Sequence, residues 1–280
     1  MINFVWRLHI MVTFPIAKIN IGLNVTKKRN DGFHDIETVF YPIGLSDILE
    51  IVPAEDGVFG FKQSGIPSGR AEYNLCVRAY RIFNEQRMFP AVKLHLHKMI
   101  PVGAGLGGGS SDAAFTLKML NHIFQAGLTG KELFEMAEAL GSDCPFFLDP
   151  RPVYATGRGT TFTPVSLEVK DRFLALVKPK TSVSTPLAYS LVTPAIPSVR
   201  LQDSIQQPVA LWQDLIHNDF EAPVLQHFPP LRNIPEKLKD LGALFVAMSG
   251  SGSSFYGIFD HLPDKLESRF PYCFTWKGPF

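Results

Sequence analysis

The chain has 280 residues, with 27 Lys and Arg against 26 Asp and Glu, and 46% of the residues are hydrophobic, which is enough for one large or two ordinary domains with a buried core. Proteins that bind mainly nucleic acids or anionic membranes carry an excess of Lys and Arg, and the formal net charge of +1 shows that this chain has no such excess. The sequence also lacks the run of about 18 apolar residues that a membrane-spanning helix requires. Any anion that this protein binds must therefore be held by local groups.

The first ten residues and the cysteines indicate the cellular compartment. Residues 1–10 are expected to be an N-terminal extension, because a cleaner strand pattern starts at Met11. His9 and Pro15 interrupt the nearby apolar stretch, and no cleavage site follows, which argues against a signal peptide. The three cysteines lie 68 and 129 residues apart, a spacing that fits neither a disulfide framework nor a metal site. These features favour a cytoplasmic protein.

Alternation of apolar and polar residues predicts the N-terminal strands. Residues 17–25 alternate strictly, which predicts a half-buried strand with Lys18 and Asn20 on its polar face. The turn Asn30-Asp31-Gly32 and a return strand at 33–41 complete a hairpin. Two shorter strands are predicted at 48–52 and 58–61.

The next segment surrounds a cluster of glycines. Asn74 is expected to cap a helix, and the alternating residues 92–97 predict a strand that leads into the cluster. Five of the seven residues from 103 to 109 are glycine. A helical apolar stripe follows at Ala113, Leu117, Leu120 and Phe124, and Thr129 with Glu132 forms a capping box for another helix at 131–140. The glycines are therefore placed between a strand and the N-terminus of a helix.

A proline-rich stretch divides the chain. Eight of the 22 prolines lie between residues 150 and 208, and a boundary near residue 160 gives an N-terminal domain of residues 11–160 and a C-terminal domain of residues 161–280. In the second domain, strands are expected at 173–177, 243–247 and 254–259, and helices at 209–220 and 234–241. The predicted class is α+β, with two domains.

The glycine-rich segment is the strongest chemical signal. Because glycine has no side chain, backbone N–H groups here can close on phosphate oxygens, and the dipole of the following helix favours the negative charge. Ser110 and Ser111 add hydroxyl groups for a phosphate or for a magnesium ion. A flexible turn with one of these serines as an ordinary helix cap is the simpler alternative. The coincidence of strand, dense glycines, paired serines and helix favours phosphate binding.

Three common nucleotide-binding signatures do not explain the segment. Gly103, Gly105 and Gly108 match the dinucleotide-binding fingerprint, but the helix at 131–140 stands where that fold requires a strand ending in an acidic residue. A P-loop is excluded, because no Lys followed by Ser or Thr comes after the glycines. The H-R-D and D-F-G motifs of protein kinases are absent from the sequence.

Three segments together resemble the GHMP family of small-molecule kinases, named for galactokinase, homoserine kinase, mevalonate kinase and phosphomevalonate kinase. Residues 101–114 (PVGAGLGGGSSDAA) resemble its ATP-binding motif, and residues 17–24 (AKINIGLN) and 248–254 (MSGSGSS) resemble its first and third motifs, in the right order. The resemblance implies an N-terminal α/β domain similar to the second domain of a small-subunit ribosomal protein, and a ferredoxin-like C-terminal domain. Within the family, residues 31–34 (DGFH) and 140–145 (LGSDCP) are similar to kinases that phosphorylate a cytidine-diphosphate-linked methylerythritol on the non-mevalonate route to isoprenoids.

The resemblance implies roles for individual residues. Asp143 is expected to accept or orient the hydroxyl proton, beside Lys18. The ATP-binding residues implied are Pro101, Gly103, Gly105, Leu106, Gly107, Gly108, Gly109, Ser110, Ser111, Asn74 and Lys98. Those implied for the acceptor substrate are Asn20, Phe33, His34, Thr185, Tyr189, Ser249 and Gly250.

The cytosine of such a substrate would stack on Phe33 and Tyr189, and His34 would read its edge. The family usually has tyrosine at the position of Phe33, so stacking is retained while a phenol hydrogen bond is lost. No dedicated metal ligands are assigned. His95 and His97 are interpreted as a solvated strand face, and Cys144 as a small buried residue.

The function implied is the ATP- and Mg²⁺-dependent phosphorylation of a small-molecule alcohol by a monomer or homodimer, with no nucleic acid or membrane partner. One alternative is a kinase of the same family acting on homoserine or mevalonate, substrates that lack a base for Phe33, His34 and Tyr189 to bind. The other is a catalytically silent nucleotide-binding or RNA-binding relative. The presence of Lys18 and Asp143 and the small net charge of +1 argue against this second alternative.

Overall fold

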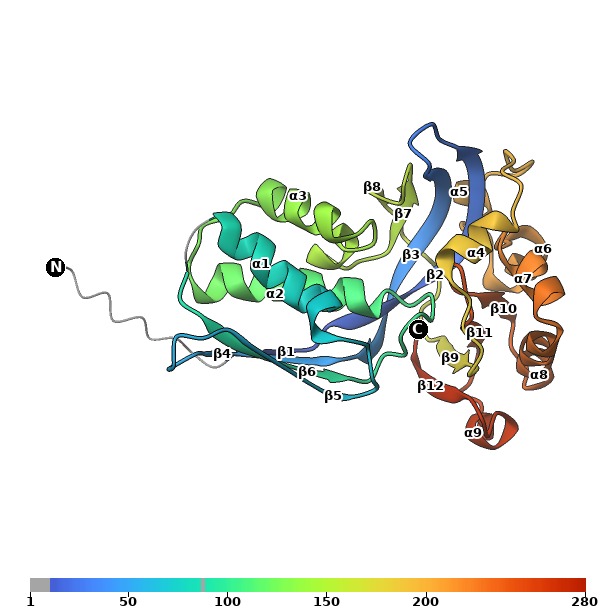
Figure 1. Ribbon diagram of the computed structural model, residues 1–280. Helices are drawn as coiled ribbons and strands as arrows, with labels where there is room; N and C mark the ends of the chain where they lie inside the picture. Colours follow the sequence, from blue (N-terminus) through green and yellow to red (C-terminus); the bar gives the residue numbers. More distant parts are fainter. Residues whose placement is uncertain (1–10, 87–88) are drawn as a thin grey trace. The chain divides into compact units, whose positions relative to one another are not determined.

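The computed structural model describes residues 11–86 and 89–280 (Figure 1). The predicted extension at residues 1–10 lies outside them. The described chain forms two compact units that are not successive halves. The first unit comprises the described residues up to Ile16 together with Ser46–Val102 and Gly108–Asp149, and the second comprises Ala17–Leu45, Gly103–Gly107 and Pro150–Phe280. This division differs from the predicted boundary near residue 160, because the N-terminal hairpin pairs with strands that follow residue 150.

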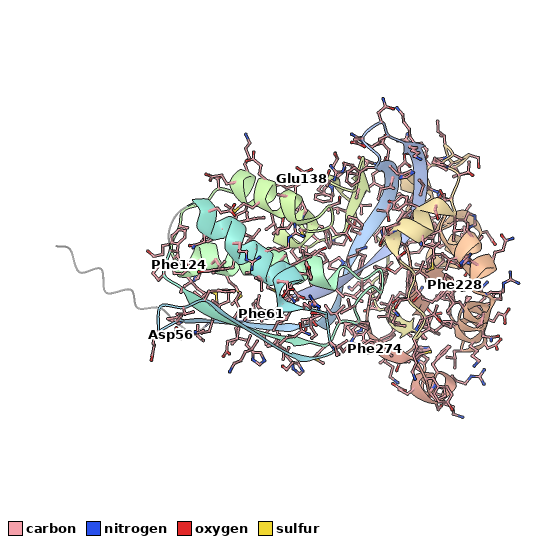
Figure 2. All side chains as sticks on the ribbon, viewed as in Figure 1. Asp56, Phe61, Phe124, Glu138, Phe228 and Phe274 are labelled. Carbon is pink, nitrogen blue, oxygen red and sulfur yellow. The ribbon has the colours of Figure 1, made fainter. Side chains whose placement is uncertain are left out.

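The first unit is a four-stranded sheet with helices on one face (Figure 1). Its strand order is β1 (Met11–Thr13), β4 (Ile48–Pro53), β6 (Val92–Lys98) and β5 (Gly60–Gly65), and only β5 runs parallel to its neighbour β6. The helical elements are η1 (Ala71–Tyr73), α1 (Leu75–Gln86), α2 (Gly108–Ile123), α3 (Gly130–Leu140) and η2 (Pro145–Leu148). Asp56 marks the turn between β4 and β5 (Figure 2). The strand predicted at 58–61 begins at Gly60 instead and continues to Gly65.

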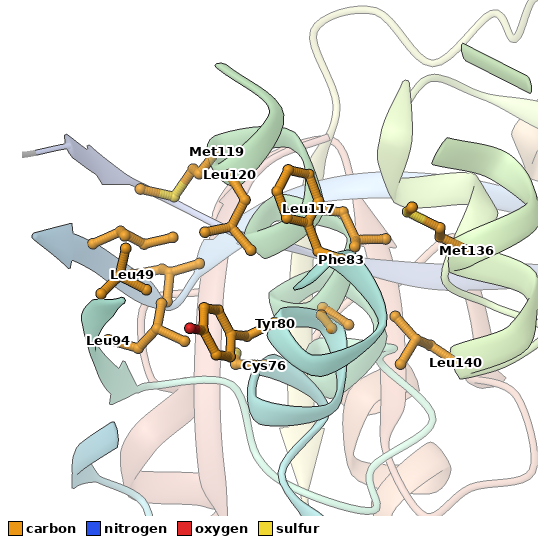
Figure 3. Close-up of a cluster of buried hydrophobic side chains, with 14 of the residues drawn as sticks. Leu49, Cys76, Tyr80, Phe83, Leu94, Leu117, Met119, Leu120, Met136 and Leu140 are labelled. Atoms are coloured by element: carbon orange, nitrogen blue, oxygen red, sulfur yellow. The ribbon is translucent and has the colours of Figure 1, made fainter. Parts of the chain in front are cut away.

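Apolar side chains from the sheet and all three helices form the core of the first unit (Figure 3). Leu49 and Leu94 contribute from the sheet, Phe83 from α1, Leu117 from α2 and Leu140 from α3. Both predicted helix starts are confirmed. Asn74 Oδ1 accepts the N–H of Cys76 at 2.9 Å, and the side chain of Thr129 accepts the N–H of Glu132 while the Glu132 carboxylate accepts the N–H of Thr129.

The second unit contains two four-stranded sheets. One has the order β2 (Ile16–Lys28), β3 (His34–Ser46), β7 (Val153–Thr156) and β8 (Thr161–Pro164). The other is antiparallel throughout, with the order β10 (Phe245–Met248), β11 (Phe255–Phe259), β9 (Phe173–Lys178) and β12 (Phe274–Pro279). The helical elements of the second unit are α4 (Thr185–Ser190), α5 (Leu201–Ser204), η3 (Val209–Leu211), α6 (Trp212–Leu215), α7 (Glu221–His227), η4 (Pro229–Arg232), α8 (Asn233–Asp240) and α9 (Leu266–Arg269).

Three features of the second unit depart from the predictions. The helix predicted at 209–220 is divided into the short elements η3 and α6 and ends at Leu215. The residues on either side of the predicted boundary near residue 160 form the hairpin β7–β8, which was not predicted and whose turn contains Gly157 and Gly159 with positive φ angles. The edge strand β12 was not predicted. Within the described part of the chain, no helix combines the length and apolar character needed to cross a lipid bilayer.

Candidate active site

Lys18 and Asn20 lie side by side on β2 and are buried. Their exposed fractions are 3% and 2%, and Lys18 Nζ lies 2.5 Å from Asn20 Oδ1. The glycine-rich segment covers them. Lys18 Nζ donates to the carbonyl oxygen of Gly105 at 3.3 Å, and the backbone N–H of Lys18 donates to the carbonyl oxygen of Leu106 at 3.0 Å. The strand was predicted to be half-buried, but its polar face is buried here as well. An ammonium group held among oxygen acceptors is oriented before any ligand arrives.

The serine-glycine segment that follows β10 meets the same two elements. Ser249 is fully buried, and its Oγ donates to the carbonyl of Gly105 at 2.9 Å and accepts the N–H of Asn20 at 3.2 Å. The buried hydroxyl of Tyr256 donates to the carbonyl of Asn20 at 2.9 Å. Parts of all three motifs, more than 80 residues apart in the sequence, thus meet within the second unit.

The close approach of these segments involves glycine at two positions. Gly105 has φ +75°, and a Cβ atom there would lie 2.0 Å from the carbonyl oxygen of Ser249. Gly250 has φ +56°, and its Cβ would lie 3.2 Å from Asn20 Oδ1. The left-handed backbone favours glycine at both positions; the space at position 105 excludes a side chain, whereas at position 250 a neighbour would have to shift by a few tenths of an ångström.

Asn218 holds the serine-glycine segment in place and was not predicted. Its Nδ2 donates to the carbonyls of Met248 at 2.8 Å and Gly250 at 2.9 Å, and its Oδ1 accepts the N–H of Phe220 at 3.0 Å. A single asparagine outside any motif gives no signal in the sequence. Only the fold shows that its amide bridges two chain segments.

The residues predicted to bind a base form two aromatic contacts. His34 stacks on Tyr189 with 4.6 Å between ring centroids and 22° between planes. Phe33 is 48% exposed, and the Arg158 guanidinium lies 3.7 Å from its ring centroid. Arg158, in the β7–β8 turn, was not predicted. Burial and the charge of Lys28 lower the pKa of His34, so its imidazole is neutral at pH 7 and offers one donor and one acceptor.

Thr185 lies next to the serine-glycine segment. Its Oγ1 is 3.1 Å from Ser251 Oγ, beside the predicted Ser249 and Gly250.

In the first unit, His95 is exposed and His97 is half-buried, and a ring nitrogen of each lies 2.9 Å from Ser64 Oγ. The strand face that carries the two histidines is solvated, as predicted.

The first unit carries the predicted residues at the end of the glycine-rich segment and after α3. The helix α2 starts at Gly108, so that Ser110 is half-buried in its first turn and Ser111 is fully buried. Asp143 is half-buried in the turn between α3 and η2. The adjacent Cys144 is buried, which raises the pKa of its thiol to about 12, so it is a neutral packing residue as predicted.

Lys98, predicted to contact ATP, is buried with its ammonium between two carboxylates. Its Nζ lies 2.7 Å from Asp112 Oδ2 and also contacts Asp47. Among residues 11–86 and 89–280, no cluster of three or more His, Cys, Asp or Glu side chains is arranged to hold a metal ion.

Comparison with known proteins identifies the family. The GHMP kinases N terminal domain matches residues 74–149, and the GHMP kinases C terminal domain matches residues 201–273. The 4-diphosphocytidyl-2-C-methyl-D-erythritol kinase of Parabacteroides distasonis is 48% identical over 270 residues, covering 96% of this chain and 99% of that protein. The chain belongs to the 4-diphosphocytidyl-2-C-methyl-D-erythritol (CDP-ME) kinases. The Bacteroides fragilis CDP-ME kinase is 46% identical, covering 94% of this chain and 98% of that protein.

Solved structures agree with membership of the CDP-ME kinases. A crystal structure titled 4-(cytidine 5'-diphospho)-2C-methyl-D-erythritol kinase matches with a TM-score of 0.79 and 34% identity over 96% of this chain and 98% of that chain. The homoserine kinase of Cytophaga hutchinsonii, at 14% identity and a TM-score of 0.57, shares the fold. The predicted α+β GHMP kinase fold is thereby confirmed. The roles of individual residues in ATP and substrate binding stay predictions.

Proposed function

We propose that this CDP-ME kinase transfers the γ-phosphoryl group of ATP to the 2-hydroxyl of CDP-ME, giving the 2-phosphate and ADP in the non-mevalonate isoprenoid pathway. The observation that carries the proposal is 48% identity to a CDP-ME kinase along nearly the whole of both chains. Homoserine and mevalonate are not favoured as substrates, because solved homoserine and mevalonate kinases resemble this chain at only 12–17% identity, which reflects the fold alone.

The glycine-rich segment and the N-terminus of α2 are proposed to hold the phosphates of ATP. Glycine amides and the first N–H groups of a helix have no partner within the helix, and they point toward an incoming anion. Gly108, Gly109, Ser110 and Ser111 form this helix start. With a net charge of only +1, such local donors are the main attraction that the chain offers to ATP.

Mg²⁺ accompanies ATP in this proposal, and the residues present were tested for a fit. Ser111 Oγ and Asp112 Oδ1 are enclosed, each without a hydrogen-bond partner in the described chain, and the other oxygen of Asp112 is bound to Lys98, so neither suits a hydrated cation. The half-buried hydroxyl of Ser110 is a hard oxygen ligand that fits. Ser110 together with the phosphates would hold the ion, which when bound neutralises phosphate charge.

Two residues are proposed to assist the transfer itself. Asp143 takes the proton of the 2-hydroxyl as its oxygen attacks the γ-phosphorus, and ADP leaves. Lys18 offsets the negative charge of the transferring group, for which its ammonium is already oriented by Asn20 and Gly105. Phosphoryl transfer needs little covalent help from a protein, so positioning of this kind accounts for most of the rate.

The cytosine of CDP-ME is proposed to bind where Phe33, His34 and Tyr189 lie. Stacking of a base on an aromatic ring is worth about 1–3 kcal/mol in comparable sites. The neutral imidazole of His34 matches the cytosine edge, which presents both donors and acceptors. The half-exposed ring of Phe33 offers the stacking surface. Asn20, Thr185, Ser249 and Gly250 are proposed to contact the erythritol and diphosphate.

Measurement of ADP release tests the proposed substrate. The purified protein is incubated with ATP and Mg²⁺ and with CDP-ME, homoserine or mevalonate in turn. Turnover is expected with CDP-ME alone. Turnover on homoserine or mevalonate without turnover on CDP-ME would reject the proposal.

The Asp143→Asn variant tests the proposed base. Its kcat is expected to fall by about 10²–10⁴-fold, as is typical on loss of a general base, while ATP still binds. Glu138→Gln is the matched control, because it removes an exposed carboxylate from α3, the helix that precedes Asp143 (Figure 2). Near-normal turnover of Asp143→Asn would show that another group accepts the proton.

A further inference from the structure

The inner strand β9 of the second unit ends in a buried lysine. Lys178 is 6% exposed and follows four fully buried apolar residues, 174–177. Within the sheet it pairs with Phe274 of the edge strand β12 (Figure 2). Burial lowers the pKa of Lys178, and no carboxylate of the described chain pairs with its ammonium to oppose this. Because an ammonium group without a counter-ion is costly to bury, its N–H groups need other acceptors.

Two backbone carbonyl groups are those acceptors. Lys178 Nζ donates to the carbonyl oxygen of Pro179 at 2.7 Å and to that of Thr181 at 3.1 Å. Both carbonyls lie at the start of the loop 179–184, which joins β9 to α4. A hydrogen bond from a charged donor is about twice as strong as a neutral one. The buried ammonium therefore holds the start of this β9–α4 loop against the end of the strand.

The β9–α4 loop is also tied to the serine-glycine segment. Ser253 Oγ donates to the carbonyl oxygen of Thr181, which thus accepts both a hydroxyl and the Lys178 ammonium. Immediately after the loop, Thr185 Oγ1 lies within hydrogen-bond distance of Ser251 Oγ. These groups all belong to the second unit. The Thr181 carbonyl is therefore the point at which the end of β9, the loop and the serine-glycine segment are joined.

The loop leads directly into α4, which carries two of the residues proposed to bind CDP-ME. Ser184, the last residue of the loop, caps this helix by accepting the N–H of Leu187 at 3.3 Å. Thr185 is the first residue of α4, and Tyr189, which stacks on His34, comes one turn later. With six residues, α4 is too short to be a stable helix on its own. Its position, and with it that of both side chains, therefore depends on the loop.

We propose that Lys178 is a positioning residue for the acceptor substrate. Acting with Ser253 on the Thr181 carbonyl, its ammonium holds the β9–α4 loop in the conformation that presents Thr185 and Tyr189 to CDP-ME. This inference rests on the proposed binding of CDP-ME by these two residues. A loop that is already ordered loses little freedom when the substrate binds, and this raises affinity. Lys178 acts through the loop and not on the reacting atoms, so its loss should weaken substrate binding and leave the chemical step unchanged.

Steady-state kinetics of the Lys178→Met variant test the inference. Methionine fills similar space with a flexible apolar chain but donates no hydrogen bond. The KM for CDP-ME should rise about tenfold, the effect expected on loss of one charge-assisted hydrogen bond, while kcat and the KM for ATP stay within about twofold of the wild type. Lys180→Met is the matched control, because it removes an exposed lysine from the same loop and should behave as the wild type. An unchanged KM for CDP-ME in Lys178→Met, or an equal rise in both KM values, overturns the inference.

Hydrogen exchange of the substrate-free protein reports on the loop itself. The N–H groups of Leu187 and Ala188 both bond to Ser184 at the end of the loop. They should exchange about tenfold faster in Lys178→Met than in the wild type, while the amides of β6 in the first unit keep their rates. Equal exchange at Leu187 and Ala188 in the two proteins overturns the inference, because the loop would then be held by other contacts.

Ser253→Ala is a second variant, which leaves the buried lysine in place and removes the other donor to the Thr181 carbonyl. Its KM for CDP-ME and the exchange at Leu187 and Ala188 should both rise, and no change in either would also contradict the proposal. A wild type that does not bind CDP-ME would reject the proposed substrate. The exchange comparison needs no substrate, so it decides on the role of Lys178 in that case too.

Discussion

Replacement of Gly105 by alanine is the sharpest steric test of the candidate site. Gly105 has φ +75°, and an added Cβ would lie 2.0 Å from the carbonyl oxygen of Ser249. Gly103 is the matched control in the same segment, since it has a similar φ of +61° and its Cβ would meet nothing within 4 Å. Comparison of the two alanine variants separates the cost of the strained backbone, which both share, from the cost of steric overlap, which only position 105 has.

The expected cost of each substitution follows from this geometry. A left-handed alanine costs about 1–2 kcal/mol, which applies to both variants. At position 105 the new methyl group is also about 1.5 Å too close to the carbonyl oxygen, and overpacking of this kind adds about 1–3 kcal/mol. Gly105→Ala should therefore be destabilised by about 2–5 kcal/mol and Gly103→Ala by only about 1–2 kcal/mol.

Thermal unfolding and ATP titration measure the two effects. For a chain of this size, 1 kcal/mol corresponds to about 2–4 °C in Tm, so Gly105→Ala should melt at least about 2 °C below Gly103→Ala. ATP binding should also be weaker in Gly105→Ala, because relief of the overlap moves the segment that is proposed to hold the phosphates. Equal melting temperatures for the two variants would refute the reasoning, since they would show that the segment does not approach Ser249 this closely.

Three further outcomes are expected. Phe33→Ala should raise the KM for CDP-ME by about tenfold through lost base stacking, and an equal rise in the KM for ATP would contradict the assignment. Tyr256→Phe removes a buried hydroxyl that donates to the Asn20 carbonyl, and urea unfolding should show a loss of about 1 kcal/mol, whereas an unchanged midpoint would count against this hydrogen bond. Folding raises the pKa of Asp112 from 3.8 to about 8. The protonated carboxyl therefore contributes its full share to the free energy of unfolding below pH 3.8, and this contribution is lost as the pH rises through about 8. Melting curves across this range should show that loss in the wild type and not in Asp112→Asn.

Local signals in the sequence predicted the parts of the fold that depend on neighbouring residues. The cap at Asn74 and the box of Thr129 and Glu132 involve groups within three residues of one another, and both form as expected. The strand β12 was missed because Gly278 and Pro279 are poor strand residues and its partner β9 lies about a hundred residues earlier. At the edge of a sheet such residues are tolerated, because one side of the strand needs no partner.

The motifs predicted which residues matter in the candidate site, but not how they are held. Alternation along β2 predicted a half-buried strand with Lys18 on its polar face, because the pattern of one strand carries no information about what covers that face. The covering group, the carbonyl of Gly105, comes from a segment 87 residues away. Asn218 and Arg158 lie outside all three motifs, and their contacts exist only once distant segments have met.

The interleaving of the two units along the chain has a consequence for synthesis on the ribosome. The first unit is complete once Asp149 has been made, but the strands β2 and β3 belong to the second unit, which ends at Phe280. At translation rates of about 5–20 residues per second, this hairpin waits on the order of ten seconds for the strands β7 and β9 to emerge. During that interval its apolar side chains lack their final partners. We therefore expect nascent chains released near residue 150 to associate with chaperones through this hairpin, even though the first unit has all its residues.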